Sequence, residues 1–305
     1  MVLKCVGITG ATGMLGRHLR SVFSDAGVKV AAVSRSDSGE YSSKAWNLAD
    51  WLSFEKLDEL FFGVEVLVHA GAMVPAGGPV DDGLMFSVNV RASANLGEWA
   101  LARNIPMVYI SGAIVYADTS ASLIPEDAPT GPNGVGGFYG FSKLLAEDVL
   151  LRFRQRGLNL AIVRPSSIYG FGLGQNKMMI SFLRKAAANG ILEITQPVQD
   201  RVDLVHALDV ATAVRNIISR ECWTTFNISS GQSLSIKDIA DCCVSVCKNG
   251  EVVVVGEECL HRERVDRYSL STLRAKNLLG WSPTIDFAEG LLMTKFGNTR
   301  GIQSS

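Results

Sequence analysis

The feature that most constrains the fold is a glycine-rich turn close to the start of the chain. Residues 6–16, VGITGATGMLG, run from an apolar segment into three glycines spaced three apart, Gly10, Gly13 and Gly16. Glycine lets the backbone turn sharply and lets a ligand approach without meeting a Cβ. A helix that begins in such a turn presents unpaired N–H groups and a positive dipole end, which attract a phosphate. The segment therefore predicts a strand, a tight turn and a helix that bind a dinucleotide.

Strand-like and helix-like patterns alternate through the first half of the chain. Strands are expected at 4–9, 28–33, 64–69, 107–110 and 160–164, and helices at 14–26, 52–62, 84–104 and 138–157. Such alternation is typical of βαβ units around a parallel sheet. We therefore predict an α/β fold of the Rossmann type, with a doubly wound parallel sheet and a smaller α/β substrate-binding region on the C-terminal side.

The pattern becomes less regular after residue 165. Short strands are expected at 202–205, 226–228 and 252–255, and helices at 208–219, at 236–248 and, twice, between 272 and 293. We assign residues 1–165 and about 203–230 to a nucleotide-binding domain. Residues 166–202 and 231–305 form a smaller substrate-binding domain in this prediction.

Composition excludes several classes of function. The 29 basic and 30 acidic side chains give a net charge of −1, and no basic block is present, which argues against a nucleic-acid or polybasic membrane surface. No apolar run is long enough for a membrane span, and we expect no signal peptide, because the first predicted strand starts near Met1. The six cysteines form neither a secreted disulfide framework nor a zinc pattern. We expect a cytoplasmic protein that acts on a small molecule.

The end of the second predicted strand bears on the choice of nucleotide. It reads Val33-Ser34-Arg35, without the carboxylate that accepts from the ribose hydroxyls in NAD sites. Arg35 and Ser34 suit a 2′-phosphate, which they could bind through charge-assisted hydrogen bonds. We therefore favour NADP(H) over NAD(H), the alternative being that Arg35 is only a solvated loop residue. Asp50 is expected to meet the adenine.

Tyr139 and Lys143 are the candidate reacting groups. They lie four apart in YGFSK at a predicted helix start, and residues at this spacing share one helix face. A free tyrosine loses its proton near pH 10, and a neighbouring lysine cation favours the phenolate. Tyr139 could then exchange a proton with a carbonyl or an alcohol. Taken alone, the pair could also be a chance feature of a surface helix.

The order of the motifs carries a family resemblance. The glycine turn is followed by HAGA (69–72), Asn89 in SVNVR, Ser111 after a strand, the Tyr139–Lys143 pair and RPSSIYG (164–170). The series continues with RVDLVHALDVA (201–211), FNISSG (226–231) and LGWSP (279–283). The chain resembles, over essentially its whole length, the extended short-chain dehydrogenase/reductase family of NAD(P)-dependent sugar-nucleotide epimerases, dehydratases and ketoreductases.

The resemblance implies roles for individual residues. Together with the turn, it assigns cofactor binding to Gly10, Thr12, Gly13, Met14, Leu15, Gly16, Ser34, Arg35, Asp50, Ala70, Gly71, Ala72, Asn89, Lys143 and Pro165. Tyr139 becomes the acid/base, Lys143 also holds the nicotinamide ribose, and Ser111 hydrogen-bonds the reacting oxygen. The usual position of that hydroxyl is occupied here by Gly112, so Ser111 fits if the loop register differs by one.

The same loop limits the reaction. Related 4,6-dehydratases carry acidic residues where this chain has Gly112-Ala113, so a dehydratase is not expected, and no Cys/His pair for a double epimerisation is evident. The NADP(H) interpretation favours an oxidoreductase that reduces or oxidises a keto or hydroxyl group, with Tyr139 as acid/base. The alternatives are a single-centre epimerase with tightly bound NAD(P), a reductase of a small non-nucleotide ketone or aldehyde, and a non-catalytic NADP-binding redox sensor.

A nucleotide sugar is the expected substrate. The assigned substrate-binding residues are Tyr169, Arg201, Arg262 and Arg267. Guanidinium groups suit a diphosphate, although Arg201 and the basic cluster at 261–268 could equally form a salt-bridged surface with Glu257, Glu258, Glu263 and Asp266. The short region between 169 and 201 would also suit a smaller ketone. The resemblance further implies a homodimer in which helices 84–104 and 138–157 pair across a two-fold axis, with contributions from Trp99, Leu144 and Leu151 unless these face the core.

Overall fold

The computed structural model describes residues 3–35, 43–75, 79–195, 198–256 and 266–297. The strands are β1 (Cys5–Thr9), β2 (Lys29–Ser34), β3 (Lys44–Ala45), β4 (Val66–His69), β5 (Met107–Ile110), β6 (Leu160–Pro165), β7 (Ser167–Tyr169), β8 (Ile191–Ile194), β9 (Arg201–His206), β10 (Thr225–Ile228), β11 (Ser233–Ser235), β12 (Glu251–Val254) and β13 (Asp266–Arg267). The helices are α1 (Met14–Asp25), α2 (Phe54–Leu60), α3 (Asp82–Phe86), α4 (Ala92–Ala102), α5 (Gly137–Gln155), α6 (Met178–Ala187), α7 (Ala207–Ser219), α8 (Ile236–Cys247), α10 (Leu273–Leu279) and α11 (Phe287–Phe296).

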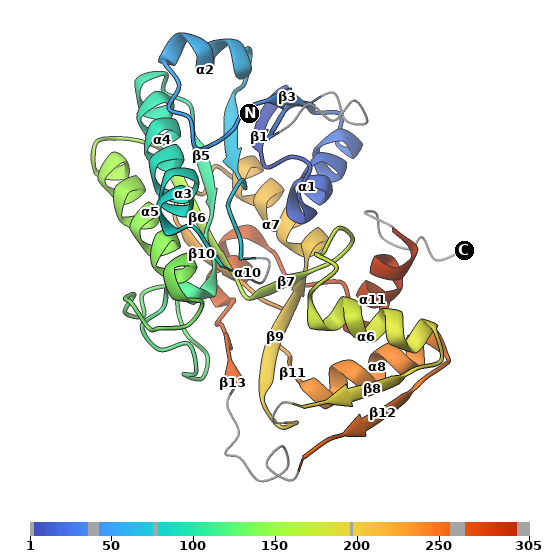
Figure 1. Ribbon diagram of the computed structural model, residues 1–305. Coiled ribbons are helices and arrows are strands. Elements are labelled where there is room, and N and C mark those ends of the chain that lie inside the picture. Colours follow the sequence, from blue (N-terminus) through green and yellow to red (C-terminus); the bar gives the residue numbers. More distant parts are fainter. Residues whose placement is uncertain (1–2, 36–42, 76–78, 196–197, 257–265, 298–305) are drawn as a thin grey trace.

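A parallel sheet of seven strands forms the centre of the larger part of the molecule (Figure 1). Its strand order is β10-β6-β5-β4-β1-β2-β3, and β1 pairs in parallel with both β2 and β4. The chain thus leaves β1 towards one edge of the sheet and returns to build the other. In open α/β sheets this reversal point opens a crevice at the carboxyl ends of the strands, where ligands bind. The predicted Rossmann-type fold class is confirmed.

Helices cover both faces of this sheet (Figure 1). On one face α1 packs against α7, and Leu19, Phe23 and Ile217 meet Ile8 of β1 in one hydrophobic core. On the other face α4 and α5 pack together over a second core. Successive side chains of a strand point to opposite faces. Burial on both faces therefore explains the nearly continuous apolar runs of the central strands.

A smaller α/β region follows β6. Here β11, β9 and β13 form a sheet to which β7 adds by pairing with β9, and β8 pairs with β12. Helices α6, α8 and α11 pack on these strands around a core that includes Phe182, Leu192, Ile239 and Leu291. Strand β10 belongs to the main sheet, whereas β9 belongs to the smaller one. The position of the domain boundary between the two regions stays a prediction.

The helix predicted at 84–104 consists of three segments. Helix α3 continues through a π-helical turn (Ser87–Arg91) into α4. The strands β3, β7, β8, β11 and β13 and the helix α6 were not predicted. Strands of two to four residues are too short for a periodic pattern. Helix α6, in contrast, does place Met179, Phe182, Leu183 and Ala186 on one buried face, a helical spacing that was overlooked.

In the described part of the chain, no helix is long and apolar enough to cross a membrane.

Candidate active site

The turn after β1 and the turn after β4 pack closely at the reversal point of the sheet. Gly10 has a φ of +68°, and a Cβ there would lie 2.7 Å from the backbone N of Gly71. A Cβ on Gly16 would overlap the carbonyl oxygen of Gly10. Gly13 is the N-cap residue of α1, and no side chain caps that helix end. These backbone contacts explain why glycine is needed here, and they leave the start of α1 open to a ligand.

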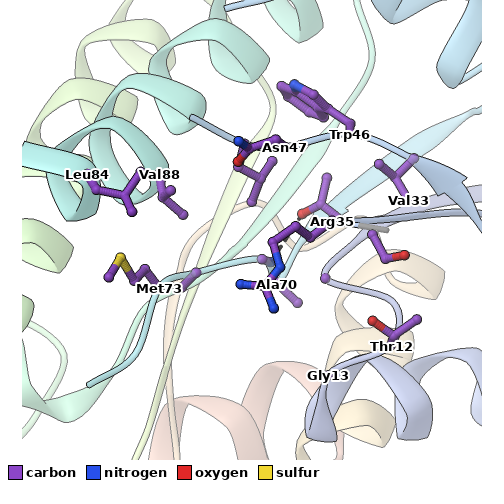
Figure 2. A pocket seen from close by; sticks show the side chains of 16 residues that line it. Thr12, Gly13, Val33, Arg35, Trp46, Asn47, Ala70, Met73, Leu84 and Val88 are labelled. Carbon is purple, nitrogen blue, oxygen red and sulfur yellow. Dashed lines mark hydrogen bonds between the residues drawn. The ribbon is translucent and has the colours of Figure 1, made fainter. Parts of the chain in front are cut away.

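A cavity of about 460 Å³ lies beside these turns (Figure 2). Its lining consists of Thr9, Gly10, Thr12, Gly13, Val33, Ser34, Arg35, Trp46, Asn47, Leu48, Ala70, Gly71, Ala72, Met73, Leu84 and Val88. Eight predicted cofactor residues are among them: Gly10, Thr12, Gly13, Ser34, Arg35, Ala70, Gly71 and Ala72. The glycine cradle, the uncapped helix start and the volume fit a dinucleotide cofactor.

The end of β2 lies at this cavity as predicted, but Ser34 and Arg35 differ in their exposure to solvent. Arg35 is exposed, and Figure 2 shows its side chain projecting into the cavity. Ser34 is buried, and its hydroxyl is 2.8 Å from that of Ser43. Asp50 does not line this cavity. It borders an adjoining hollow of about 580 Å³, to which Arg35 also contributes. Arg35 therefore has an exposed side chain at both hollows, whereas Ser34 is buried.

The lysine of the predicted reacting pair is anchored to the end of β5. Lys143 is buried, and its Nζ donates to the carbonyl oxygen of Ile110 at 2.7 Å. Its ammonium also lies 4.3 Å from the ring centroid of Tyr109. Burial lowers the pKa of Lys143 to about 7, while the charge of Glu147 opposes this shift. The side chain thus connects α5 to the strand that leads into Ser111.

The phenol of Tyr139 is poorly acidic in its surroundings. Burial raises its pKa to about 12, and the nearby phenol of Tyr268 adds to the shift. Ser111 follows β5, is buried, and has a hydroxyl without a hydrogen-bond partner. A buried polar group without a partner is uncommon and marks a place where a ligand can bind. Ser111 therefore has the free hydroxyl that its predicted role requires, whereas Gly112 has none.

Asn89, in the π-helical turn, makes three side-chain hydrogen bonds to neighbouring segments. Its Oδ1 accepts from the backbone N of Met73 at 2.7 Å, and its Nδ2 donates to the carbonyl of Met73 at 3.1 Å and to the Ser142 hydroxyl at 2.9 Å. The Ser142 hydroxyl in turn donates to the carbonyl of Tyr139 at 2.8 Å. Asn89 therefore links a cavity-lining segment to α5, and these contacts engage both ends of its amide.

Comparison with known proteins agrees with this geometry. Residues 6–229 match the model of the NAD dependent epimerase/dehydratase family. The chain belongs to this family. It is therefore an NAD(P)-dependent enzyme of the epimerase or oxidoreductase type.

Its relatives extend over most or all of the chain. It is 27% identical over 304 residues to a Methanocaldococcus jannaschii protein described as "Putative UDP-glucose 4-epimerase", covering 93% of this chain and 95% of that one. It is also 30% identical over 234 residues to the hybrid PKS-NRPS synthetase xenE of Xenoacremonium sinensis, covering 70% of this chain and 6% of the synthetase.

Two solved structures illustrate the shared fold. The UDP-N-acetylglucosamine 4-epimerase of Bacillus cereus has a TM-score of 0.82 at 24% identity, covering 96% of each chain. MoeE5 in complex with UDP-glucose and NAD has a TM-score of 0.79 at 21% identity, covering 95% of this chain and 96% of that one.

The remaining residues predicted to bind the cofactor near the turn lie outside the lining of the cavity. Leu15 is buried in the core, and Met14 packs against the same core. Pro165 is the last residue of β6. Gly16 keeps α1 close to the turn. These positions shape the crevice, and their side chains are absent from the lining of the cavity.

Two of the predicted substrate residues are engaged within the protein. Tyr169 is 1% exposed and its ring packs against those of His206 and Phe287, so its side chain fills the interior, and its role as a substrate contact stays a prediction. Arg201 donates to the carbonyl of Ser233 at 2.7 Å and pairs with Asp238 at 3.6 Å. Arg201 is thus in an ion pair, although its partner Asp238 is not among the acidic residues named for the salt-bridged alternative.

The other two basic residues lie in the 257–267 segment. Arg262 is outside the described residues. Arg267 is on β13 and aligns with Val202 of β9, so it points to the opposite sheet face from Arg201. The pairing of β13 with β9 brings the two segments together, but it does not converge these two guanidinium groups on one point.

Tyr268 is a site residue that the sequence analysis missed. It has a φ of +61°, which is rare for an aromatic residue, and its N–H donates to the carbonyl of Thr119 at 2.8 Å. Its phenol lies near enough to Tyr139 to raise the pKa of that residue. The only sequence signal was its position directly after Arg267.

Proposed function

We propose that the protein is an NADP(H)-dependent oxidoreductase that reduces or oxidises a keto or hydroxyl carbon of a sugar nucleotide. The observation that carries the proposal is the intact pair of Tyr139 and Lys143 on α5, with the unpartnered hydroxyl of Ser111 after β5. The cofactor, when bound in the cavity beside the glycine turn, supplies or accepts the hydride. Gly112-Ala113 provide no acid for water elimination, so we do not assign a dehydratase activity.

The residues divide the remaining chemistry between them. The Ser111 hydroxyl donates to the reacting oxygen of the substrate and orients it. Tyr139 gives a proton to that oxygen during reduction and removes one during oxidation. Because burial, with a smaller contribution from Tyr268, raises the pKa of Tyr139 to about 12, removal of a proton requires a neighbouring cation, and Lys143 provides it. The attachment of Lys143 to the carbonyl of Ile110 keeps this cation fixed.

Replacement of the tyrosine tests the mechanism. Tyr139→Phe should abolish turnover and leave NADPH affinity nearly unchanged, because only the phenolic oxygen is lost. Steady-state kinetics and fluorescence titration with NADPH measure the two effects. Turnover equal to that of the wild type would refute the mechanism. A wild-type protein that binds NADPH and reduces neither keto-sugar nucleotides nor simple ketones would instead support the redox-sensor alternative.

Arg35 is the basis for preferring NADP(H). Arg35→Ala should weaken NADPH binding far more than NADH binding, because only NADPH carries the 2′-phosphate. Lys56→Ala, a basic residue of the adjoining hollow, is the matched control. Similar losses for both nucleotides would refute this role. The comparison is informative because two solved neighbours, MoeE5 and the Thermus thermophilus UDP-glucose 4-epimerase, are described in complex with NAD.

An epimerase is the second candidate function. It is favoured by the Methanocaldococcus relative of matching length, whose description names a UDP-glucose 4-epimerase. The two activities differ in what happens to the cofactor. A reductase consumes NADPH in proportion to product, whereas an epimerase interconverts UDP-glucose and UDP-galactose without net absorbance change at 340 nm. Nucleotide released from the denatured purified protein would further support the epimerase.

A nucleotide sugar is the proposed substrate class. Supporting this choice, the described relatives include epimerases named for UDP-glucose and UDP-N-acetylglucosamine. A thermal-shift panel of nucleotide sugars in the presence of NADP(H) tests it, because a ligand that binds only the native state raises the unfolding temperature. Stabilisation by simple ketones or aldehydes, and by no nucleotide sugar, would favour the small-substrate alternative.

We further propose a cytoplasmic homodimer. The five cysteines of the described residues are free thiols, as a reducing compartment would allow. The dimer would form through α4 and α5. Trp99 and Leu144 are buried within the subunit, so exposed aromatic residues such as Phe141, 38% exposed, are better candidates for the contact. Light scattering of the wild type and of Phe141→Asp tests the interface, and a monomeric wild type would refute it.

A further inference from the structure

A buried ion pair, Glu147 with Arg164, begins one helical turn after Lys143 on α5. Glu147 follows Lys143 by one turn of α5 and is 1% exposed. Its Oε2 accepts from Nη2 of Arg164 at 2.6 Å, and Nε of Arg164 lies 3.1 Å from Oε1. Arg164 comes from β6, the strand beside β5. The pair therefore joins α5 to β6 of the main sheet.

Arg164 is itself held from several directions. Its Nη1 donates to the carbonyl of Glu126 at 3.1 Å, and its guanidinium lies 4.8 Å from the ring centroid of Tyr116. The Tyr116 hydroxyl in turn donates to Oδ1 of Asn227 at 2.6 Å. The ion pair with Glu147 keeps the pKa of Arg164 above its ordinary value, so this side chain stays charged. A guanidinium so constrained holds the Glu147 carboxylate in one place.

Of the titratable groups that the structure describes around Lys143, one is a carboxylate. His69 of β4 is buried and neutral, because burial lowers its pKa to about 3. Tyr109 of β5 and Tyr139 of α5 are phenols whose pKa values burial raises. Among the residues that the structure describes, Glu147 is the carboxylate whose charge acts on Lys143. Residues four apart on a helix share a face, so Glu147 and Lys143 lie on the same side of α5.

We propose that Glu147, clamped by Arg164, is a positioning residue that keeps Lys143 in its cationic form and so sets the pH range in which Tyr139 can release its proton. Burial works against the ammonium, and its Nζ donates to a neutral carbonyl, which does not compensate for the lost hydration of a charge. The Glu147 carboxylate supplies the missing compensation. The consequence for Tyr139 rests on the proposed function, whereas the effect on Lys143 does not.

The charge of Lys143 can be observed without any assay of activity. In protein labelled with 13C at the lysine ε-carbon, the Lys143 resonance is identified by its loss in Lys143→Arg. Glu147→Gln should lower the titration midpoint of this resonance by about one pH unit or more. The kcat/KM of the same variant should fall most at the alkaline side of its pH profile. An unchanged midpoint would overturn the proposal, even if Tyr139 proved not to be the acid/base.

A double variant separates charge from folding. Loss of Glu147 alone leaves a buried guanidinium unpaired, which is strongly destabilising, whereas replacing both members of such a pair with apolar residues is often neutral. Glu147→Leu/Arg164→Met should therefore restore the unfolding midpoint while the Lys143 titration stays lowered. Recovery of the wild-type titration would overturn the proposal. Asp58→Asn, which removes a carboxylate paired with Arg103, is the matched control and should leave Lys143 unchanged.

Discussion

The hydroxyl of Ser111 makes a clear prediction at the scale of a single residue. It is buried and has no hydrogen-bond partner within the described protein, so Ser111→Ala removes no interaction from the folded state. Its removal should leave the free energy of unfolding within about 0.5 kcal/mol of wild type. Turnover should fall about 100-fold, the typical effect of losing one hydrogen bond to a reacting oxygen.

Chemical denaturation and steady-state kinetics measure the two effects separately. Ser142→Ala is a useful contrast, because the Ser142 hydroxyl connects Asn89 to the Tyr139 carbonyl and its loss should affect stability as well. Unchanged turnover of Ser111→Ala would place the substrate oxygen elsewhere.

The spacing of Tyr139 and Lys143 could be interpreted from the sequence because both residues lie on one helix, whose geometry is local. The contribution of Tyr268 could not. It reaches the site because its backbone adopts a left-handed conformation and hydrogen-bonds to Thr119, far away in the sequence.

Among the elements, the turn between β1 and α1 leaves no room for a side chain at Gly16. Gly16→Ala would drive a Cβ into the carbonyl oxygen of Gly10, so α1 must move away from the turn. We expect a lower unfolding temperature together with a loss of NADPH affinity of at least about tenfold. Isothermal titration and thermal unfolding check both effects.

Gly27→Val provides the control at the opposite end of α1. A Cβ at this glycine meets nothing within 4 Å, although its φ of +72° disfavours a branched side chain. Gly27→Val should lower the free energy of unfolding without changing the affinity of the folded protein for NADPH. Gly16→Ala with wild-type affinity would show that the close approach of helix and turn does not shape the site.

A second element-scale prediction concerns the attachment of the C-terminal segment to α7. Asp209 is buried, and its carboxylate accepts from the backbone N and hydroxyl of Thr284 and from the backbone N of Ile285. Asp209→Ala leaves these donors without partners and should cost about 3 kcal/mol. The urea midpoint measures this loss. A change below about 0.5 kcal/mol would show that the segment is held by packing alone.

At the scale of the whole molecule, buried histidines make stability depend on pH. Burial lowers the pKa of His69 and His206 to about 3, whereas an exposed histidine titrates near pH 6.5. Between about pH 3 and pH 6.5, each of these two histidines is protonated in the unfolded chain and neutral in the folded protein. Each histidine should therefore remove about 1.4 kcal/mol of stability per pH unit as pH falls below 6.5, and have no effect above it.

The His206 contribution can be isolated by substitution. Its Nδ1 accepts from the N–H of Leu208 at the start of α7, and asparagine can cap a helix in the same way without titrating. His206→Asn should reduce the slope of unfolding free energy against pH between 6 and 4 by the equivalent of one proton. Urea unfolding at several pH values measures it, and identical slopes would contradict the prediction.

The sequence by itself determined the features that depend on local spacing. The glycines of the first turn, the alternation of strands and helices and the Tyr139–Lys143 pair all follow from residues close together in the chain, and their order indicated the family. Glycine, helix periodicity and strand alternation act over a few residues, so no tertiary information was needed to recognise them.

Only the tertiary structure decided which polar groups are available to a ligand. Tyr169 matched a motif but is enclosed by α11, Asn89 already has partners, and Arg201 pairs with Asp238. Conversely, Ser111 has an unpartnered hydroxyl and Glu147 faces a buried cation. Burial and hydrogen bonding between segments arise from contacts far apart in the chain. The turn at Gly10 shows both aspects: its glycines are visible in the sequence, but its need for glycine comes from Gly71.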